Sequence, residues 1–352
     1  MQSSSAAQVR TRHSTPAPAA ATPPRRAGAA DGGPAQAASQ ALRYARRAYR
    51  DRRWPDRMKQ LLRWPALAAL RPRESIDWFQ RCEQPDLRPL LQRQPHLALK
   101  PLRPYVSVRW DRARRARVIL DSCEFLLSGP APLRDALLRP EGRVLATAVL
   151  GQGETLELHL GSQFRFRKEG ELVLTLRAGP EGRAVASAAL AFECTVSGSW
   201  RAYIGCLQGA PEARAQHGRL TKAAHGLRPQ ALLIFVAQEI ARALRLEALL
   251  AVGEEIHVHR SKHLLRVPGG RRLRFDYERL WLEAGAQRMP DGWYALPLRA
   301  RRRARGEQPA HKRAMYERRY ALMDDIAQRV ALGLHAGSFP ASRPQAVAPA
   351  GS

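Results

Sequence analysis

Polar side chains that can bind an anion gather in one connection of the chain, between residues 208 and 229. They are Gln208, Arg219, Thr221, Lys222 and Arg228. Pro229 follows directly, and proline is favoured at the first position of a helix because its missing N–H would be unpaired there. The dipole and free N–H groups of a helix N-terminus attract negative charge, and Arg228 would reinforce that attraction. The segment predicts either a phosphate or carboxylate site, or a structural lid whose polar groups cap the helix.

Three further side chains are candidates for acid–base catalysis: Glu169, His225 and Glu255. Histidine exchanges protons near neutral pH, and His225 lies within the anion-binding segment, where a catalytic and a structural role are both open. Glu169 is in a turn between strands, a position where carboxylates are more often solvated. Glu255 alternates with His257 and His259, which would place three metal-ligand types on one side of a strand. No further ligand is anchored elsewhere, so we assign no metal.

A buried strand, a helix and a second strand must hold these residues in place. Residues 201–207 predict an apolar central strand, residues 229–246 an amphipathic helix, and residues 246–252 another strand. Upstream, residues 143–150, 154–160, 163–168, 171–177 and 184–194 alternate apolar and polar positions between glycine-containing turns. The pattern predicts an α+β fold with a central, mostly antiparallel sheet of six or more strands flanked by helices.

Composition changes divide the chain into four parts. Residues 1–40 and 336–352 are rich in Ala, Pro, Ser and Gly, so we expect a disordered extension and tail. Residues 41–142 predict a helical N-terminal part, and residues 143–335 the α+β core with a C-terminal helix. The basic helical pattern of residues 41–70 fits a helix docked on the domain, or one lying on an anionic membrane surface.

The charge balance favours polyanionic partners, although Arg is spread over the whole chain. The 352 residues carry 59 Lys and Arg against 31 Asp and Glu, a net charge of +28. No zinc finger or aromatic RNA-binding motif occurs, so specific nucleic-acid binding is not expected. The four cysteines are widely spaced and predict neither disulfides nor a zinc site. With no apolar run of about 18 residues and no secretory signal, we predict a cytoplasmic location.

Residues that match the motifs of a bacterial family recur in order between about residues 55 and 332. They are Lys168, Gly170, Gly205, Gly209, Gly226, Pro229, Asp276, Trp281, Arg313, Tyr316 and Arg319. On these motifs the chain resembles the VirK/YbjX family of Gram-negative bacteria, but it has Ser122 and Cys123 where an aromatic or His-Tyr pair is expected. The family has no assigned activity. The resemblance implies an accessory protein of the cell envelope, connected with virulence, surface-protein display or tolerance of antimicrobial peptides. It would act near the inner membrane, on its anionic surface or on an envelope protein.

The order of elements is similar to that of the Gcn5-related N-acyltransferases. In that fold the central strand diverges from its neighbour, and the next helix presents N–H groups to the pyrophosphate of acyl-CoA. This likeness implies acyl-CoA as a cofactor, with Glu169, His225 or Glu255 as the base. The family's Arg/Gln-x-x-Gly-x-Gly/Ala loop is absent, and residues 209–228 replace it. Acyl transfer is therefore an alternative to the accessory role, and non-specific polyanion binding is a third.

Overall fold

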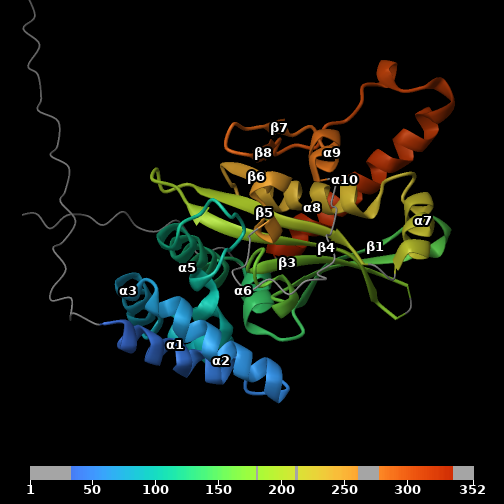
Figure 1. Ribbon diagram of the computed structural model, residues 1–352. Coiled ribbons are helices and arrows are strands. Elements are labelled where there is room, and N and C mark those ends of the chain that lie inside the picture. Colours follow the sequence, from blue (N-terminus) through green and yellow to red (C-terminus); the bar gives the residue numbers. More distant parts are fainter. Residues whose placement is uncertain (1–32, 180, 211–212, 261–276, 336–352) are drawn as a thin grey trace, which may run out of the picture.

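The computed structural model describes residues 33–179, 181–210, 213–260 and 277–335. Its N-terminal part is helical, as predicted. The helices are α1 (Pro34–Ala48), α2 (Trp54–Ala69), α3 (Pro72–Cys82), α4 (Arg88–Arg93), the 3-10 segment η1 (Pro95–Leu102), α5 (Arg112–Ser128) and α6 (Ala131–Leu138). Figure 1 shows α1, α2 and α3 side by side at one end of the molecule.

An eight-stranded sheet forms the centre of the described chain and confirms the predicted α+β class. Its strands are β1 (Arg143–Val149), β2 (Thr155–Gly161), β3 (Leu172–Ala178), β4 (Arg183–Cys194), β5 (Trp200–Gly209), β6 (Ala248–Val252), β7 (Gln287–Arg288) and β8 (Trp293–Leu296). They lie in the order β1-β2-β3-β4-β5-β6-β8-β7. All neighbours are antiparallel except β5 and β6, which are parallel.

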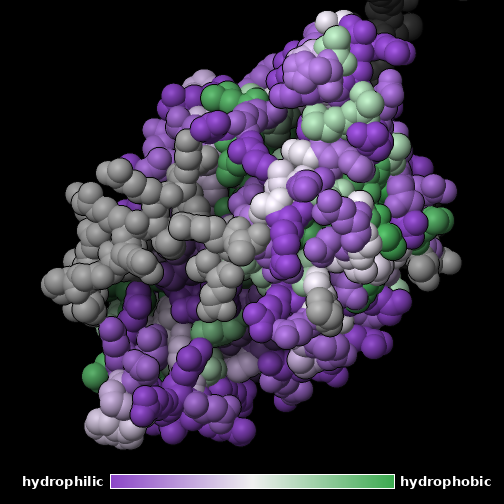
Figure 2. Space-filling view, turned by 90° about the vertical axis from the view of Figure 1, so that its right-hand side faces the viewer, coloured by the Kyte–Doolittle hydropathy of each residue, from purple (hydrophilic) through white to green (hydrophobic). Residues whose placement is uncertain are grey.

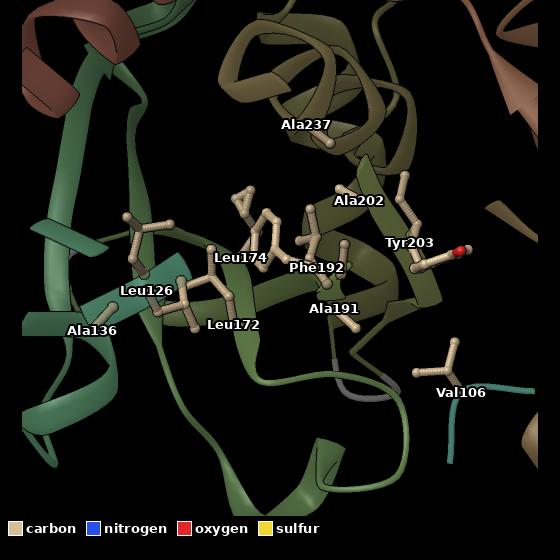
Figure 3. Packing of buried hydrophobic residues seen from close by; sticks show 14 of the residues in the cluster. Val106, Leu126, Ala136, Leu172, Leu174, Ala191, Phe192, Ala202, Tyr203 and Ala237 are labelled. Atoms are coloured by element: carbon tan, nitrogen blue, oxygen red, sulfur yellow. The ribbon is translucent and has the colours of Figure 1, made fainter. Parts of the chain in front are cut away.

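The described residues of the second half of the chain form the α-helices α7 (Arg214–Ala223), α8 (Pro229–Ala243), α9 (Tyr277–Glu283) and α10 (Arg313–His335). One face of the sheet is covered by α6, α8 and α10, since α8 packs on β3 to β5 and α10 contacts both α6 and α8. Figure 3 shows Ala202 of β5 beside Ala237 of α8, while Tyr203 points the other way. On that opposite face, Trp110 packs against Tyr203 and Trp293.

Two predictions of local structure are wrong. The segment 163–168 is not a strand, because Phe164–Phe166 form a 3-10 turn that buries Phe166 against β3, β4 and β5. The N-terminal boundary at residue 40 is also misplaced, because α1 begins at Pro34. Ala37, Ala41 and Ala45 form a buried stripe on α1, and such small side chains let neighbouring helices approach closely. Composition alone made this helix look like low-complexity sequence.

Ser122, which stands where the family resemblance leads us to expect part of an aromatic or His-Tyr pair, has a structural role. The pairing of β3 with β4 stops at Leu190, so the following backbone groups of β4 need other partners. The hydroxyl of Ser122 in α5 accepts the N–H of Phe192 at 2.7 Å and donates to its carbonyl at 3.0 Å. Asp121 accepts the N–H of Cys194 at 3.1 Å. The polar side chains of α5 thus complete the open part of β4.

The surface matches the Arg-rich composition. On the face shown in Figure 2, hydrophilic side chains dominate and apolar areas are small. Among the described residues, no helix is long and apolar enough to cross a membrane.

Candidate functional site

The strands β5 and β6 separate in the middle of the sheet. They pair only from Arg201 opposite Ala248 to Ile204 opposite Ala251. At this point β5 contains a bulge, because Ala189 of β4 pairs with Cys206 and Leu190 with Ile204, which leaves Gly205 as the extra residue. Bulges of this kind disrupt the ladder locally, so the carboxyl half of β5 has no parallel partner.

Gly205 and Gly170 are glycines because two segments touch through them. A β-carbon at Gly205 would lie 1.9 Å from the carbonyl oxygen of Glu169, and one at Gly170 would lie 2.5 Å from that of Leu190. The Lys168–Glu171 segment therefore lies flat against the bulge. This contact explains why Gly170 and Gly205 belong to one signature.

Glu169 is buried beside the bulge, with only 3% of its surface exposed. The expectation of a solvated carboxylate is therefore wrong. Its Oε1 lies 3.1 Å from Nε2 of His259, and its Oε2 accepts the N–H of Lys168 at 3.2 Å. Burial raises the pKa of Glu169, but the hydrogen bond from His259 and the neighbouring positive charges outweigh it, so the pKa lies below its ordinary value. The carboxylate is therefore ionised at neutral pH.

His257 completes this polar cluster. Its Nδ1 accepts the N–H of His259 at 3.2 Å, which places the ring proton on Nε2, near the backbone of Gly205. Burial lowers the pKa of His257 to about 4, so the ring is neutral at pH 7. The ring centroids of His259 and Tyr277 lie 4.9 Å and 5.3 Å away. His259 stands at the rim, because 42% of its side chain is exposed.

The second carboxylate of the signature, Glu171, forms a different pair. It accepts from the Nζ of Lys100, and the two side chains are 0% and 2% exposed. The ammonium lies 5.6 Å from the ring centroid of Tyr105. This pair has no access to solvent, so we regard it as structural.

A hollow of about 420 Å³ lies at the N-terminus of α8. It is lined by His217, Gly218, Thr221, Arg228, Pro229, Gln230 and Leu280. Thr221 and Arg228 are predicted anion-binding residues, and Pro229 opens the helix as expected. The guanidinium of Arg228 pairs with Glu283 of α9 and remains half-exposed. The hollow thus combines a helix N-terminus with a cation. The hydroxyl of Thr221 and the ring of His217 also line it, but they are hydrogen-bonded to the carbonyls of His217 at 2.7 Å and Val185 at 2.9 Å.

The other predicted residues lie outside both the cluster around Glu169 and the hollow at the N-terminus of α8. Gln208 accepts from Arg165 at 3.4 Å, and Lys222 is exposed on α7 outside the hollow, as is Arg219. Glu255 is exposed in a 3-10 turn and lies 3.5 Å from Arg288 and 3.8 Å from Arg109. The expected strand arrangement of Glu255 with the two histidines is wrong, because only the histidines turn towards Glu169. In the described chain no three His, Cys, Asp or Glu side chains gather to hold a metal ion.

His225 lies in a turn held by the C-terminal helix. Its φ is 52° and that of Gly226 is 81°, two successive left-handed residues after α7. Arg319 of α10 donates from Nε to the carbonyl of His225 at 2.9 Å, and its guanidinium packs over the ring of Tyr316 at 4.8 Å. A β-carbon at Gly226 would lie 2.5 Å from Nη2 of Arg319. The C-terminal signature residues therefore anchor this turn.

Two of the remaining signature residues, Trp281 and Gly209, contact elements next to the central strands. Trp281 is fully buried and donates to the carbonyl of Val252 at the end of β6 at 2.9 Å. A β-carbon at Gly209 would lie 2.8 Å from the ring of His217. Arg313 is exposed at the start of α10. Asp276 is outside the described residues.

Comparison with known proteins agrees with the family resemblance. Residues 53–332 match the family described as "Protein of unknown function (DUF535)". The chain belongs to this family. It is 31% identical to the uncharacterized protein YbjX of Escherichia coli over 281 residues, which cover 78% of this chain and 82% of that protein. An uncharacterized protein of Haemophilus influenzae is 31% identical over 110 residues, 31% of this chain and 35% of that protein. The predicted VirK/YbjX membership is confirmed, while the choice of signature residues stays a prediction. Of these residues, Gly205 lies at the bulge of β5, Pro229 at the hollow and Gly226 in the turn before α8.

Sequence reasoning missed the polar residues His217 and Gln230, which line the hollow. It named His259 only as a possible metal ligand and did not foresee its contact with Glu169. The spacing of His257 and His259 did place both rings on one side. Nothing in the sequence indicated that Glu169, about ninety residues earlier, would meet them.

Proposed function

We propose that this DUF535 protein transfers an acyl group from a CoA thioester. The supporting observation is the position of two sites along one strand. The hollow lies beside Gly209 at the end of β5, and Glu169 lies against Gly205, four residues earlier. Four strand residues span roughly 13 Å. A ligand with phosphates at one end and a reacting thioester at the other would fit this spacing.

The two sites also lie on opposite faces of the sheet. The hollow is on the α8 side. Cys206 lies on the Tyr203 side, because it pairs opposite Ala189, two residues before the partner of Tyr203. Cys206 is close to Glu169. In this proposal the ligand passes between β5 and β6, beyond the point where their pairing ends at Ile204 and Ala251, to bring its thioester to the carboxylate.

The phosphates would be held by side chains rather than by a glycine-rich loop. Arg228 supplies a cation and α8 supplies free N–H groups, whereas the hydroxyl of Thr221 already donates to the carbonyl of His217 at 2.7 Å. This arrangement accounts for the missing phosphate loop, because α7 and the turn at Gly226 occupy its place in the chain.

We assign proton transfer to His259, with Glu169 as its orienting partner. His259 is half-exposed and can meet an acceptor amine, whereas His257 is buried and neutral. As the amine nitrogen bonds to the thioester carbon, its proton passes to His259 and the C–S bond breaks. The same proton then passes from His259 to the departing thiolate, so the amide and the free thiol are released and His259 returns to its starting state.

Calorimetry tests the binding step. Acetyl-CoA and long-chain acyl-CoA should give saturable heat, and Arg228→Ala should weaken binding about tenfold to a hundredfold. Arg242→Ala is the matched control, because it removes the same charge at the other end of α8. The absence of heat with every thioester would refute the proposal.

Thiol release tests the chemical step. With acetyl-CoA, palmitoyl-CoA and a panel of amines, His259→Ala should reduce the rate about 10²- to 10⁴-fold. Glu255→Gln should leave it unchanged, because that carboxylate is exposed and faces Arg288. Equal losses in both variants would remove His259 from this role.

At the level of the cell, we propose an accessory role in the envelope, with the protein acting from the cytoplasmic side of the inner membrane. The support is the family resemblance together with the net charge of +28. Non-specific polyanion binding would instead give DNA affinity that falls steeply with salt and ignores sequence. Cell fractionation tests the location: recovery only outside the inner membrane and cytoplasm would contradict it.

A further inference from the structure

The helix α2 exposes large apolar side chains that the fold does not use. Trp54 is 73% exposed, Leu62 70% and Leu70, the residue that caps the helix, 68%. Leu62, Ala66 and Leu70 recur every four residues, and each step turns only about 40° around the helix. They therefore form one apolar strip, which we call the outer strip.

Another side of α2 already secures the helix to the protein. Trp64 and Ala68 are 1% and 0% exposed, and Leu61 and Leu67 pack against the same core. The Trp64 ring stacks on Tyr49 at 6.4 Å between centroids. The outer strip is thus a second apolar surface on a helix whose packing is complete without it.

Positive charge surrounds this strip. Residues 41–73 contain eleven Arg and Lys against two Asp. Arg46, Arg47, Arg53 and Lys59 are exposed and have no acidic partner among the described residues. Basic side chains around an apolar strip are typical of helices that lie at a membrane surface.

We propose that α2 docks on an anionic lipid surface through the outer strip. Leu62 and Leu70 would enter the interface between headgroups and acyl chains, while Arg53 and Lys59 bind lipid phosphates. A second copy of the chain fits less well, because it would bring the same positive charges together. A nucleic acid would use the charges but leave the apolar strip in water.

Vesicle flotation of the full-length chain tests this proposal independently of acyl transfer. The chain should float with vesicles of phosphatidylcholine and phosphatidylglycerol, and at least tenfold less with phosphatidylcholine alone. Leu62→Gln with Leu70→Gln, and separately Arg53→Glu with Lys59→Glu, should each reduce flotation at least tenfold. Leu332→Gln and Arg318→Glu are controls that change exposed residues of α10 and should float like the unmodified chain.

Circular dichroism would verify that each variant is folded. The proposal would be overturned if the α2 variants floated as well as the unmodified chain. It would also be overturned if the α10 controls reduced flotation as much as the α2 variants did. A dimer in sedimentation that the leucine changes abolish, without flotation, would also overturn it and assign the strip to contact between copies. Thioester binding should be the same in all these variants, so a failed flotation leaves the acyltransferase test unaffected.

Discussion

The buried pair of Lys100 and Glu171 gives the sharpest test of how the two parts of the molecule are joined. Lys100 belongs to η1 of the helical part, and Glu171 immediately precedes β3 in the sheet. Both side chains are almost completely excluded from solvent. Removing one partner leaves an uncompensated buried charge, which costs about 3–5 kcal/mol, whereas removing both is often nearly neutral.

The substitutions Lys100→Met and Glu171→Gln preserve the side-chain length while removing one charge each. Each single variant should lower the free energy of unfolding by about 3–5 kcal/mol, a large part of the stability of an ordinary domain. The double variant should recover most of that loss. The coupling free energy should therefore reach several kcal/mol, far above that of an exposed pair.

Urea unfolding, followed by tryptophan fluorescence and far-ultraviolet circular dichroism, measures these energies. Asp325→Asn is the control, because its partner Arg329 is half-exposed and the change should cost about 1 kcal/mol or less. Single variants that lose less than about 1 kcal/mol would refute the reasoning. A double variant whose loss equals the sum of the singles would refute it as well, since no coupling would exist.

Three further predictions concern the site itself. Burial lowers the pKa of His257 from 6.5 to about 4, so the free energy of unfolding should be highest above pH 6.5 and fall by roughly 3 kcal/mol towards pH 4. In His257→Gln, urea unfolding measured across this pH range should no longer show that fall. Gly205→Ala should destabilise the fold by about 1–3 kcal/mol or more in urea unfolding, because its β-carbon would overlap the carbonyl of Glu169. Arg319→Gln should cost about 1–3 kcal/mol in the same measurement, because the carbonyl before Gly226 loses its donor.

Each of these three has a control in the same molecule. Gly218→Ala changes a glycine of α7 that has open space around its α-carbon, so the helix should be unharmed or slightly stabilised. Arg318→Gln removes an exposed neighbour of Arg319 and should be neutral. His311→Gln changes an exposed histidine and should keep the full dependence of stability on pH. Equal effects in a variant and its control would contradict the corresponding explanation.

The fold was accessible from the sequence because its elements carry strong local patterns. The alternating strands from Arg143 onwards and the helix opened by Pro229 are periodic over enough residues to be read directly. The turn at Phe164–Phe166 was misread because its alternation of aromatic and basic residues mimics a half-buried strand. Burial of Phe166 depends on three strands that no local window contains.

The candidate site was only partly accessible, for a similar reason. Thr221, Arg228 and Pro229 are close in sequence, so their meeting at one helix end could be foreseen. Glu169 was expected in solvent because charged residues around a glycine usually form an exposed turn. Its burial follows from the contact of this segment with the bulge at Gly205, which is a tertiary event.

The two carboxylates around Gly170 should therefore differ in function although they are two residues apart. Glu169 reaches the rim through His259, whereas Glu171 is enclosed with Lys100. Glu169→Gln should reduce thiol release about 10²- to 10⁴-fold while lowering stability by only about 1 kcal/mol. Glu171→Gln should do the reverse: it should lower stability by several kcal/mol, yet the folded fraction should keep its rate. If the rate per folded molecule fell equally in both variants, the assignment of Glu169 as the partner that orients His259, and of Glu171 as a structural residue, would be wrong.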